Sequence, residues 1–233
     1  METRSDKQEQ LDNLSLQGEP LHKALKSLGW INKWFGNHRS TIKAILNVYK
    51  EQKPLKIIDL GCGGGDLILA IAKVLRKKKV NFSIIGIDGN NSSLKYAGEK
   101  CAGFEEINFQ QADILHPSFT SAPCDVLITS HFIYHFPEPE LIGFINNKLT
   151  NISTAFICSE LERSRLALFL FKLTGFLLPV SKLAKQDGEL AIKRSFTKKE
   201  WLSILMQTNI VNFRLTRVPL FRIQLIVFLD NKI

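Results

Sequence analysis

The sequence has few cysteines, and no two of them are closely spaced. The four cysteines, Cys62, Cys101, Cys124 and Cys158, lie far apart, and no Cys-x-x-Cys motif occurs. This spacing excludes a zinc ribbon, and we expect no bound metal. Cysteines without a pairing pattern are typical of reducing compartments, so we expect a cytoplasmic protein.

The sequence also lacks a long apolar run. The most apolar stretch, residues 165–180, is too short to cross a bilayer comfortably. The N-terminal sequence METRSDKQEQ has no apolar core of the kind that signal peptides need. We therefore expect residues 1–18 to form a frayed polar tail, followed by one domain over residues 19–233.

Negative charge is in short supply, and the net charge is +9 at pH 7. An excess of positive charge suggests nucleic acid or an anionic membrane surface as a partner. The basic residues are dispersed, however, and the only dense run, residues 76–79, follows an apolar helical stretch. This run is better interpreted as a solvated helix end, and we expect no nucleic acid partner.

Strands and helices alternate along most of the chain. Short apolar runs predict strands over residues 56–60, 82–87, 107–110, 126–129 and 155–158, with helical patterns between them. This alternation predicts an α/β fold with a doubly wound parallel sheet. Two further strands, residues 210–218 and 221–229, are too close for a parallel crossover and predict an antiparallel hairpin. The sheet then has seven strands, and helical patterns within residues 19–50 precede it.

Four glycines fall within five positions of the stretch IIDLGCGGGD, residues 57–66. A strand that ends in an acid, a Gly-x-Gly-x-Gly loop and a helix are typical of nucleotide binding, because glycine lets the backbone approach a ligand closely. A P-loop would continue with Gly-Lys-Ser/Thr, and a dinucleotide loop would have glycine in place of Asp66. An acid at that position repels a pyrophosphate, so phosphate is disfavoured.

The segment DLGCGGG, residues 59–65, resembles the first motif of the class I S-adenosylmethionine-dependent methyltransferases. The segments IIGID, FQQADI and DVLITS, which end near Asp88, Asp113 and Ser130, resemble the second, third and fourth motifs in order. The C-terminal hairpin also resembles the end of that family's sheet. The resemblance covers roughly residues 40–233, and it implies a Rossmann-like methyltransferase fold with S-adenosyl-L-methionine as the cofactor.

The resemblance implies roles for particular residues. It places Asp59, Gly61, Cys62, Gly63, Gly65, Asp88, Gly89, Asp113, Ile114 and Ser130 at the cofactor. In this family the second-motif acid binds the ribose hydroxyls, and the third-motif acid binds the adenine amino group. Asp88 could instead cap a helix, and Asp113 could form an Asx-turn, but those interpretations leave the order of the motifs unexplained.

Two histidines, His131 and His135, follow the fourth predicted strand at its carboxyl end, where open α/β sheets bind ligands. A histidine with an ordinary pKa of about 6.5 can take a proton from a hydroxyl acceptor at neutral pH. Both are therefore candidate catalytic bases. The alternative is that His135 packs at the start of the next helix and His131 only lines the cofactor pocket.

An apolar segment lies within residues 162–196, where this family inserts substrate-specific lids, and the family's N-terminal helices cover the same opening. A lid rich in leucine and phenylalanine implies a hydrophobic acceptor, such as a quinone, a phenolic lipid or a polyketide-type product. The basic residues close behind it also allow a peripheral contact with an anionic membrane. A helix packed within the core is the third interpretation.

The expected function is methyl transfer from S-adenosyl-L-methionine to a hydrophobic small molecule, with a hydroxyl as the expected acceptor group. Two alternatives remain open. One is an RNA methyltransferase, which the net charge favours and the lack of an Asn/Asp-Pro-Pro-aromatic motif opposes. The other is an inactive binding subunit with the same fold. The sequence leaves the oligomeric state and the methylated atom open.

Overall fold

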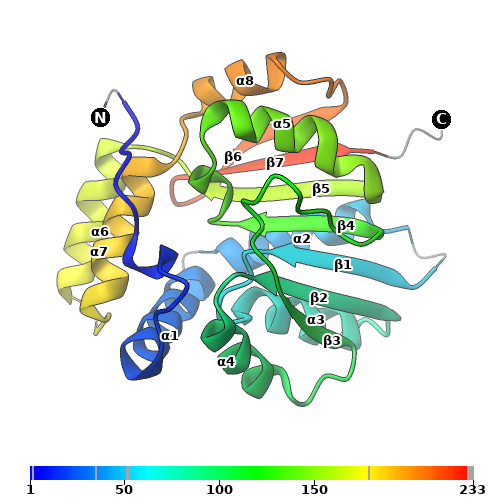
Figure 1. Ribbon diagram of the computed structural model, residues 1–233, viewed down its shortest axis with the longest axis horizontal. Helices are drawn as coiled ribbons and strands as arrows, with labels where there is room; N and C mark the ends of the chain where they lie inside the picture. The colour runs from blue at the N-terminus through cyan, green and yellow to red at the C-terminus, as the bar shows by residue number, and fades with distance from the viewer. Residues whose placement is uncertain (2, 35, 51–52, 178, 230–233) are drawn as a thin grey trace.

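The computed structural model describes residues 1, 3–34, 36–50, 53–177 and 179–229. Residues 2, 35, 178 and 230–233, which belong to the tail, the N-terminal helices, the apolar segment and the end of the expected domain, lie outside this description. The described chain contains a seven-stranded sheet with the strand order β3-β2-β1-β4-β5-β7-β6 (Figure 1). Its strands are β1 (Leu55–Leu60), β2 (Phe82–Asp88), β3 (Ile107–Gln111), β4 (Cys124–Ser130), β5 (Ile152–Leu161), β6 (Phe213–Val218) and β7 (Arg222–Phe228).

The pairing of the strands confirms the predicted sheet. Strands β1 to β5 pair in parallel, whereas β7 is antiparallel to both β5 and β6. Strand β4 is buried along nearly its whole length, as expected for a central strand covered on both faces. Because β7 runs the opposite way, its first residue, Arg222, lies at the edge where the parallel strands end.

Helices cover both faces of the sheet. Ile45, Ile68 and Leu94 belong to the core on one face, and they come from α2 (Asn37–Val48), α3 (Asp66–Lys77) and α4 (Asn91–Cys101). Leu141 and Trp201 belong to the core on the other face, and they come from α5 (Glu138–Lys148) and α8 (Lys198–Met206). All four cysteines are buried and free within this core.

Helix caps define where α4 and α8 begin. The cap of α4 is Asn90, whose side chain accepts a hydrogen bond from the Ser93 N–H. The β2 strand ends at Asp88, so Asn90 is the residue that still has extended backbone. Helix α8, which was not predicted from the sequence, begins with a capping box between Thr197 and Glu200.

Three helices stand at the end of the sheet where the parallel strands finish, rather than on a face of it (Figure 1). They are α1 (Gly18–Trp34), α6 (Arg165–Leu177) and α7 (Lys182–Arg194). The apolar segment is thus α6, and it is not a core helix, because Leu166, Phe169 and Leu173 are exposed. Among the described residues, no helix combines the length and the apolar character that crossing a membrane requires.

Residues 4–16, which we call the strap, run along α7 at the same end of the molecule (Figure 1). The Arg4 guanidinium donates to the carbonyl oxygens of Arg194 and Tyr134 at 2.6 Å each, and it stacks on the Phe196 ring at 3.7 Å. A short 3-10 helix, η1 (Gln10–Asp12), forms within the strap. The expectation of a frayed tail is therefore wrong for these residues, because their polar groups pair with polar groups of α7. The division of the chain into residues 1–18 and 19–233 stays a prediction.

Candidate active site

A cavity of about 560 Å³ lies at the carboxyl edge of the sheet. Its polar side comes from the loops that follow β1 to β4, and the strap borders it. Its apolar side comes from helices, with Leu28 and Ile31 of α1 and Leu170 and Phe171 of α6. A pocket with an apolar wall and a few converging polar groups, at this edge of an α/β sheet, is a typical ligand site.

The glycine loop between β1 and α3 contributes backbone to the cavity wall. Gly61 and Gly63 both have positive φ, at 75° and 50°, a conformation that glycine adopts without strain. A Cβ atom at Gly61 would lie 2.4 Å from the Phe132 ring, so that position is closed by protein. A Cβ atom at Gly63 would meet only Leu25, at 3.9 Å, so the bare backbone of Gly63 faces open cavity space.

Asp88 ends β2 beside this loop and lines the cavity. Its Oδ2 accepts a hydrogen bond from the Gly63 N–H at 2.8 Å, and its Oδ1 accepts one from the Asn90 N–H at 2.9 Å. Burial raises the pKa of Asp88, while these two N–H groups and the charge of His135 act to lower it. The carboxylate is thus fixed in position, with each oxygen keeping a further lone pair for a ligand.

The third predicted motif also reaches the cavity. Asp113 and Ile114 line it, and Gly89 does so beside Asp88. Asp113 also forms an Asx-turn, because its Oδ1 accepts the Leu115 N–H at 3.0 Å. The two interpretations of Asp113 are therefore compatible, since the turn uses one carboxylate oxygen and leaves the other.

Four of the ten expected cofactor residues lie outside the cavity wall that the described residues form: Asp59, Cys62, Gly65 and Ser130. Cys62 is buried, and its sulfur fills the space next to Gly86, at 2.9 Å from where a Cβ would be. Gly65 precedes α3 and packs against Ala97 of α4. Ser130 accepts a hydrogen bond from Asn37 Nδ2 at 2.6 Å, beneath α2. These three positions pack against neighbouring protein in this structure, and their placement at the cofactor stays a prediction.

Asp59 is fully enclosed beneath the glycine loop. Burial, followed by the charge of Asp88, raises the pKa of Asp59 well above its ordinary value. Its Oδ1 atom has no hydrogen-bond partner among the residues that the structure describes. Asp66, the acid that disfavoured phosphate, also lies off the wall, where it forms an ion pair with Lys100.

His131 lines the cavity, but its surroundings oppose the role of a catalytic base. Its Nε2 atom contacts the guanidinium of Arg222, and since arginine only donates, Nε2 must be the acceptor. Burial, followed by the positive charge of Arg222, lowers the pKa of His131 well below 6.5. The lone pair that would take a proton from an acceptor is thus already engaged.

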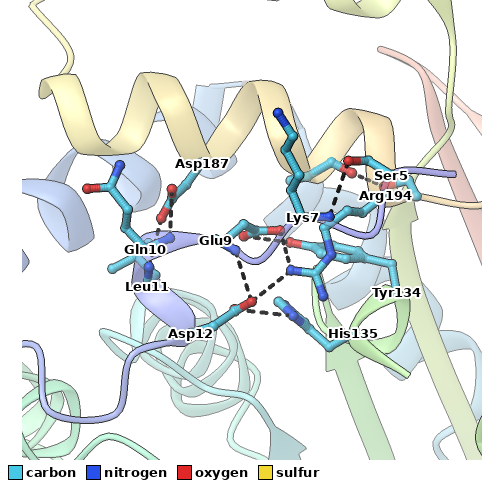
Figure 2. Close-up of polar contacts among 12 residues, drawn as sticks. Ser5, Lys7, Glu9, Gln10, Leu11, Asp12, Tyr134, His135, Asp187 and Arg194 are labelled. Atoms are coloured by element: carbon cyan, nitrogen blue, oxygen red, sulfur yellow. Dashed lines mark hydrogen bonds and ion pairs between the residues drawn. The ribbon is translucent and has the colours of Figure 1, made fainter. Parts of the chain in front are cut away.

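His135 also lines the cavity, and it belongs to a polar network with the strap (Figure 2). Its Nδ1 lies 3.2 Å from Asp12 Oδ1, and Asp12 Oδ2 accepts from Arg194 Nη1 at 2.7 Å. Burial acts to raise the pKa of Asp12, but the hydrogen bonds and charges of His135 and Arg194 prevail and hold it at about 2. His135 therefore connects the strap to the loop after β4.

The other members of this network tie the strap to α7 (Figure 2). The Asp187 carboxylate accepts the backbone N–H groups of Gln10 and Leu11, at 3.0 and 2.8 Å. Glu9 accepts a hydrogen bond from the Tyr134 hydroxyl at 3.3 Å. Burial, followed by the negative charge of Asp12, raises the pKa of Glu9 to about 8. Asp187 and Arg194 thus form a polar rim at this side of the cavity, and no sequence pattern indicated that their partners would lie on the strap.

Glu9, Asp12 and His135 lie close enough for one atom of each to coordinate a metal ion, within 4.8 Å of one another. The Arg194 guanidinium lies beside both carboxylates, 3.4 Å from Glu9 Oε1 and 2.7 Å from Asp12 Oδ2. A fixed positive charge at that point takes the place of a cation. The group is therefore an ion-pair network that closes the strap.

Arg222 is a further residue of the cavity wall that no sequence pattern indicated. It is only 2% exposed, yet it reaches the cavity wall beside Leu161 and Phe221. Glu160, at the end of β5, accepts the N–H groups of Phe132 and Ile133, at 3.0 and 3.1 Å. Burial raises the pKa of Glu160 to about 7, while these N–H groups and the charge of Arg222 oppose the rise. No local pattern marks Arg222 as a site residue, because its position follows from the antiparallel direction of β7.

Comparison with known proteins agrees with this geometry. A family described as a methyltransferase domain matches residues 51–211, which is more than half of the chain. The chain therefore belongs to this methyltransferase family, and the resemblance to class I S-adenosylmethionine-dependent methyltransferases is confirmed. S-adenosyl-L-methionine is accordingly the cofactor.

Individual relatives are more distant. A carboxy-S-adenosyl-L-methionine synthase from Campylobacter hominis is 33% identical over 98 residues, which cover 41% of this chain and 40% of that protein. A demethylmenaquinone methyltransferase from Lactobacillus johnsonii is 30% identical over 88 residues, covering 36% of this chain and 35% of the relative. The chain thus spans well under half the length of these curated relatives. A magnesium protoporphyrin IX methyltransferase from Synechocystis has a TM-score of 0.58 at 16% identity, covering 94% and 92% of the two chains, which shows a common fold.

Proposed function

We propose that this protein transfers the methyl group of S-adenosyl-L-methionine to a hydroxyl of a hydrophobic small molecule of phenolic, quinone or polyketide type. The observation that carries the proposal is the joint position of Asp88 and the bare Gly63 backbone at the polar end of a largely apolar cavity. The cofactor supplies a methyl carbon on a positively charged sulfur, which an acceptor atom attacks while the carbon–sulfur bond breaks.

The residues of the polar end fit this cofactor. Asp88 has a free lone pair on each oxygen, as the two ribose hydroxyls require, and Gly63 leaves room where a Cβ would stand. Asp113 and Ile114 lie further along the same wall, on the side of β3, where the adenine would lie. Acids along the wall favour a ligand with positive charge and hydroxyl donors over a phosphate.

The helix-lined end of the cavity supports a hydrophobic acceptor. Leu28 and Ile31 of α1 face this space together with Ala167, Leu170 and Phe171 of α6. Alignment of the two reactants in such an enclosed site is a large part of methyl-transfer catalysis. The names of the relatives, which include a quinone methyltransferase, support the same acceptor class.

The outer face of α6 supports a peripheral membrane contact through which such an acceptor is reached. Leu166, Phe169 and Leu173 are 55%, 63% and 48% exposed, and α6 contains no acidic residue. Arg165 and Lys172 are exposed on the same helix, and Lys172 also lies 3.4 Å from Glu189 of α7. A second copy of the chain would oppose these cations with identical ones, whereas an anionic lipid surface complements them. The inner face of α6 lines the cavity, so one helix joins the surface to the site.

The experiment that tests the proposed function incubates the purified protein with isotope-labelled S-adenosyl-L-methionine and a panel of phenols, quinols and short RNAs. Labelled methyl groups are then located by mass spectrometry. The proposal expects S-adenosylhomocysteine to accumulate only with a hydroxylated aromatic acceptor. Labelling of RNA instead, or binding of the cofactor without turnover on any aromatic acceptor, contradicts it.

A further inference from the structure

The end of the cavity opposite Asp88 contains a buried positive charge. Strand β7 lies four strands from β2 in the sheet, about 19 Å at roughly 4.8 Å per strand. Because β7 is antiparallel, Arg222 at its start meets Leu161 at the end of β5 and reaches the cavity there. The acids therefore lie at the cofactor end, and this guanidinium lies at the acceptor end.

Two arginines reach the wall of the cavity, and their surroundings differ. Arg194 is paired with the Asp12 carboxylate of the strap at 2.7 Å. Arg222 contacts only the neutral ring of His131, and within the described chain its Nε atom has no hydrogen-bond partner. Leaving a donor of a buried guanidinium unpaired is costly, so the site is arranged for an additional acceptor.

The nearby groups do not supply that acceptor. Glu160 is the acid that acts on Arg222, but its Oε1 is used by two backbone N–H groups, and its Oε2 has no partner among the described residues. His131 carries no charge, and His38 of α2 faces the same cation with a pKa that burial and Arg222 lower to about 4. Neither histidine can balance the charge of Arg222.

We infer that Arg222 is the binding group for an anionic oxygen of the methyl acceptor, so that the acceptor is an acidic hydroxyl compound bound as its oxyanion. This inference rests on the proposed function and narrows it to acidic phenols and enols. It also explains how the site works without a histidine base at the acceptor end. The proton leaves to solvent when the acceptor binds, and the oxyanion then carries the electron pair that forms the new oxygen–carbon bond.

The test uses 4-nitrophenol, whose visible absorption reports its protonation state, and 4-nitroanisole, which has the same shape but cannot ionise. Both are titrated into the protein in the presence of saturating S-adenosylhomocysteine. A positive charge at a few ångströms lowers the pKa of an acid by about 1–3 units. We expect bound 4-nitrophenol to ionise at least one unit below its solution pKa and to bind at least tenfold more tightly than 4-nitroanisole.

Two variants assign the effect to Arg222. Arg222→Gln should abolish both the lowered pKa of 4-nitrophenol and its tighter binding than 4-nitroanisole, while S-adenosylhomocysteine still binds. Glu160→Gln removes the competing carboxylate but keeps a carbonyl acceptor. It should therefore lower the pKa of bound 4-nitrophenol further. If 4-nitrophenol does not bind, titrates at its solution pKa or binds no better than 4-nitroanisole, the inference is overturned. The same holds if Arg222→Gln leaves the shift intact. Failure of the wild-type protein to bind S-adenosylhomocysteine would instead count against the proposed function itself.

Discussion

The backbone N–H of Gly63 donates a hydrogen bond to Asp88 Oδ2 at 2.8 Å and so connects the ends of two neighbouring strands. Gly63 belongs to the loop after β1, and Asp88 is the last residue of β2. The bond fixes the carboxylate against the Gly63 backbone, where a Cβ would face open cavity space. The polar end of the cavity, where we propose that the cofactor binds, is therefore formed by the loops after the parallel strands, and helices and β7 line the other end.

Gly61 and Gly63 are expected to respond differently to alanine. Both substitutions place a side chain at positive φ, which costs about 1–2 kcal/mol of stability. Gly61→Ala should lower the melting temperature further, since its Cβ would lie 2.4 Å from the Phe132 ring. Gly63→Ala has no such clash, and its main effect should be loss of cofactor affinity. Thermal unfolding and calorimetric titration measure the two effects, and equal losses of affinity at equal stability would contradict this assignment.

Stability should fall with rising pH because of Glu9. Its pKa is about 8 in the folded protein against an ordinary 4.5, so between these values the folded state binds more protons than the unfolded state. The free energy of unfolding therefore decreases as pH rises through this window, and the contribution is lost above pH 8. Glu9→Gln cannot ionise and should show a smaller drop in melting temperature between pH 6 and pH 9. An identical drop in the variant and the wild type would show that Glu9 ionises normally.

The two interpretations of His135 predict opposite effects of His135→Ala on kcat and on cofactor affinity. As a general base it would contribute about 10²–10⁴-fold to kcat, with cofactor affinity unchanged in His135→Ala. Its contact with Asp12 favours a role in closing the strap, so we expect His135→Ala and Asp12→Asn to weaken cofactor binding and to change kcat only a few-fold. Turnover and affinity are measured separately for each variant. A large loss of kcat in His135→Ala alone would support the base.

The exposed face of α6 predicts binding to anionic vesicles. Burying a phenylalanine or leucine side chain contributes about 1.5–3 kcal/mol, so Phe169→Ser with Leu173→Ser should reduce binding to phosphatidylglycerol vesicles at least tenfold. Val211→Ser, which alters a residue that is 94% exposed elsewhere, is the matched control. Cosedimentation with vesicles and analytical ultracentrifugation separate the outcomes. A dimer that the double variant dissociates, with no vesicle binding, would assign the face to a second copy instead.

Sequence patterns were sufficient to predict that two acids, Asp88 and Asp113, lie at one edge of the sheet, and both line the cavity. Asp88 and Asp113 follow apolar strands, and carboxyl ends of parallel strands meet at one edge, so local patterns predict that these acids lie together. The same local logic predicted the hairpin from the short spacing at Pro219-Leu220. Local patterns could not predict which motif residues line the cavity and which are covered by protein. Asp59, Cys62 and Ser130 belong to the same motifs and are covered by neighbouring elements.

The rest of the site depends on contacts between distant parts of the chain. Asp12 meets Arg194 across 182 positions, and no local pattern marks a polar N-terminal segment as part of a cavity. Arg222 gives no signal either, because its burial follows from the antiparallel direction of β7 and from its pairing with Leu161. Helix α8 is different, because a local signal for its start, the Thr197–Glu200 capping box, is visible in the sequence.

Calorimetric titration of S-adenosyl-L-methionine into Asp88→Asn tests the central claim most directly. Asparagine keeps the size of the side chain but removes the charge, and a hydrogen bond to a charged group contributes about 1.5–3 kcal/mol. We predict that the dissociation constant rises at least tenfold, while Glu105→Gln, which removes an exposed acid elsewhere, changes it less than twofold. Unchanged affinity in Asp88→Asn, at unchanged melting temperature, would contradict the placement of the cofactor in this cavity.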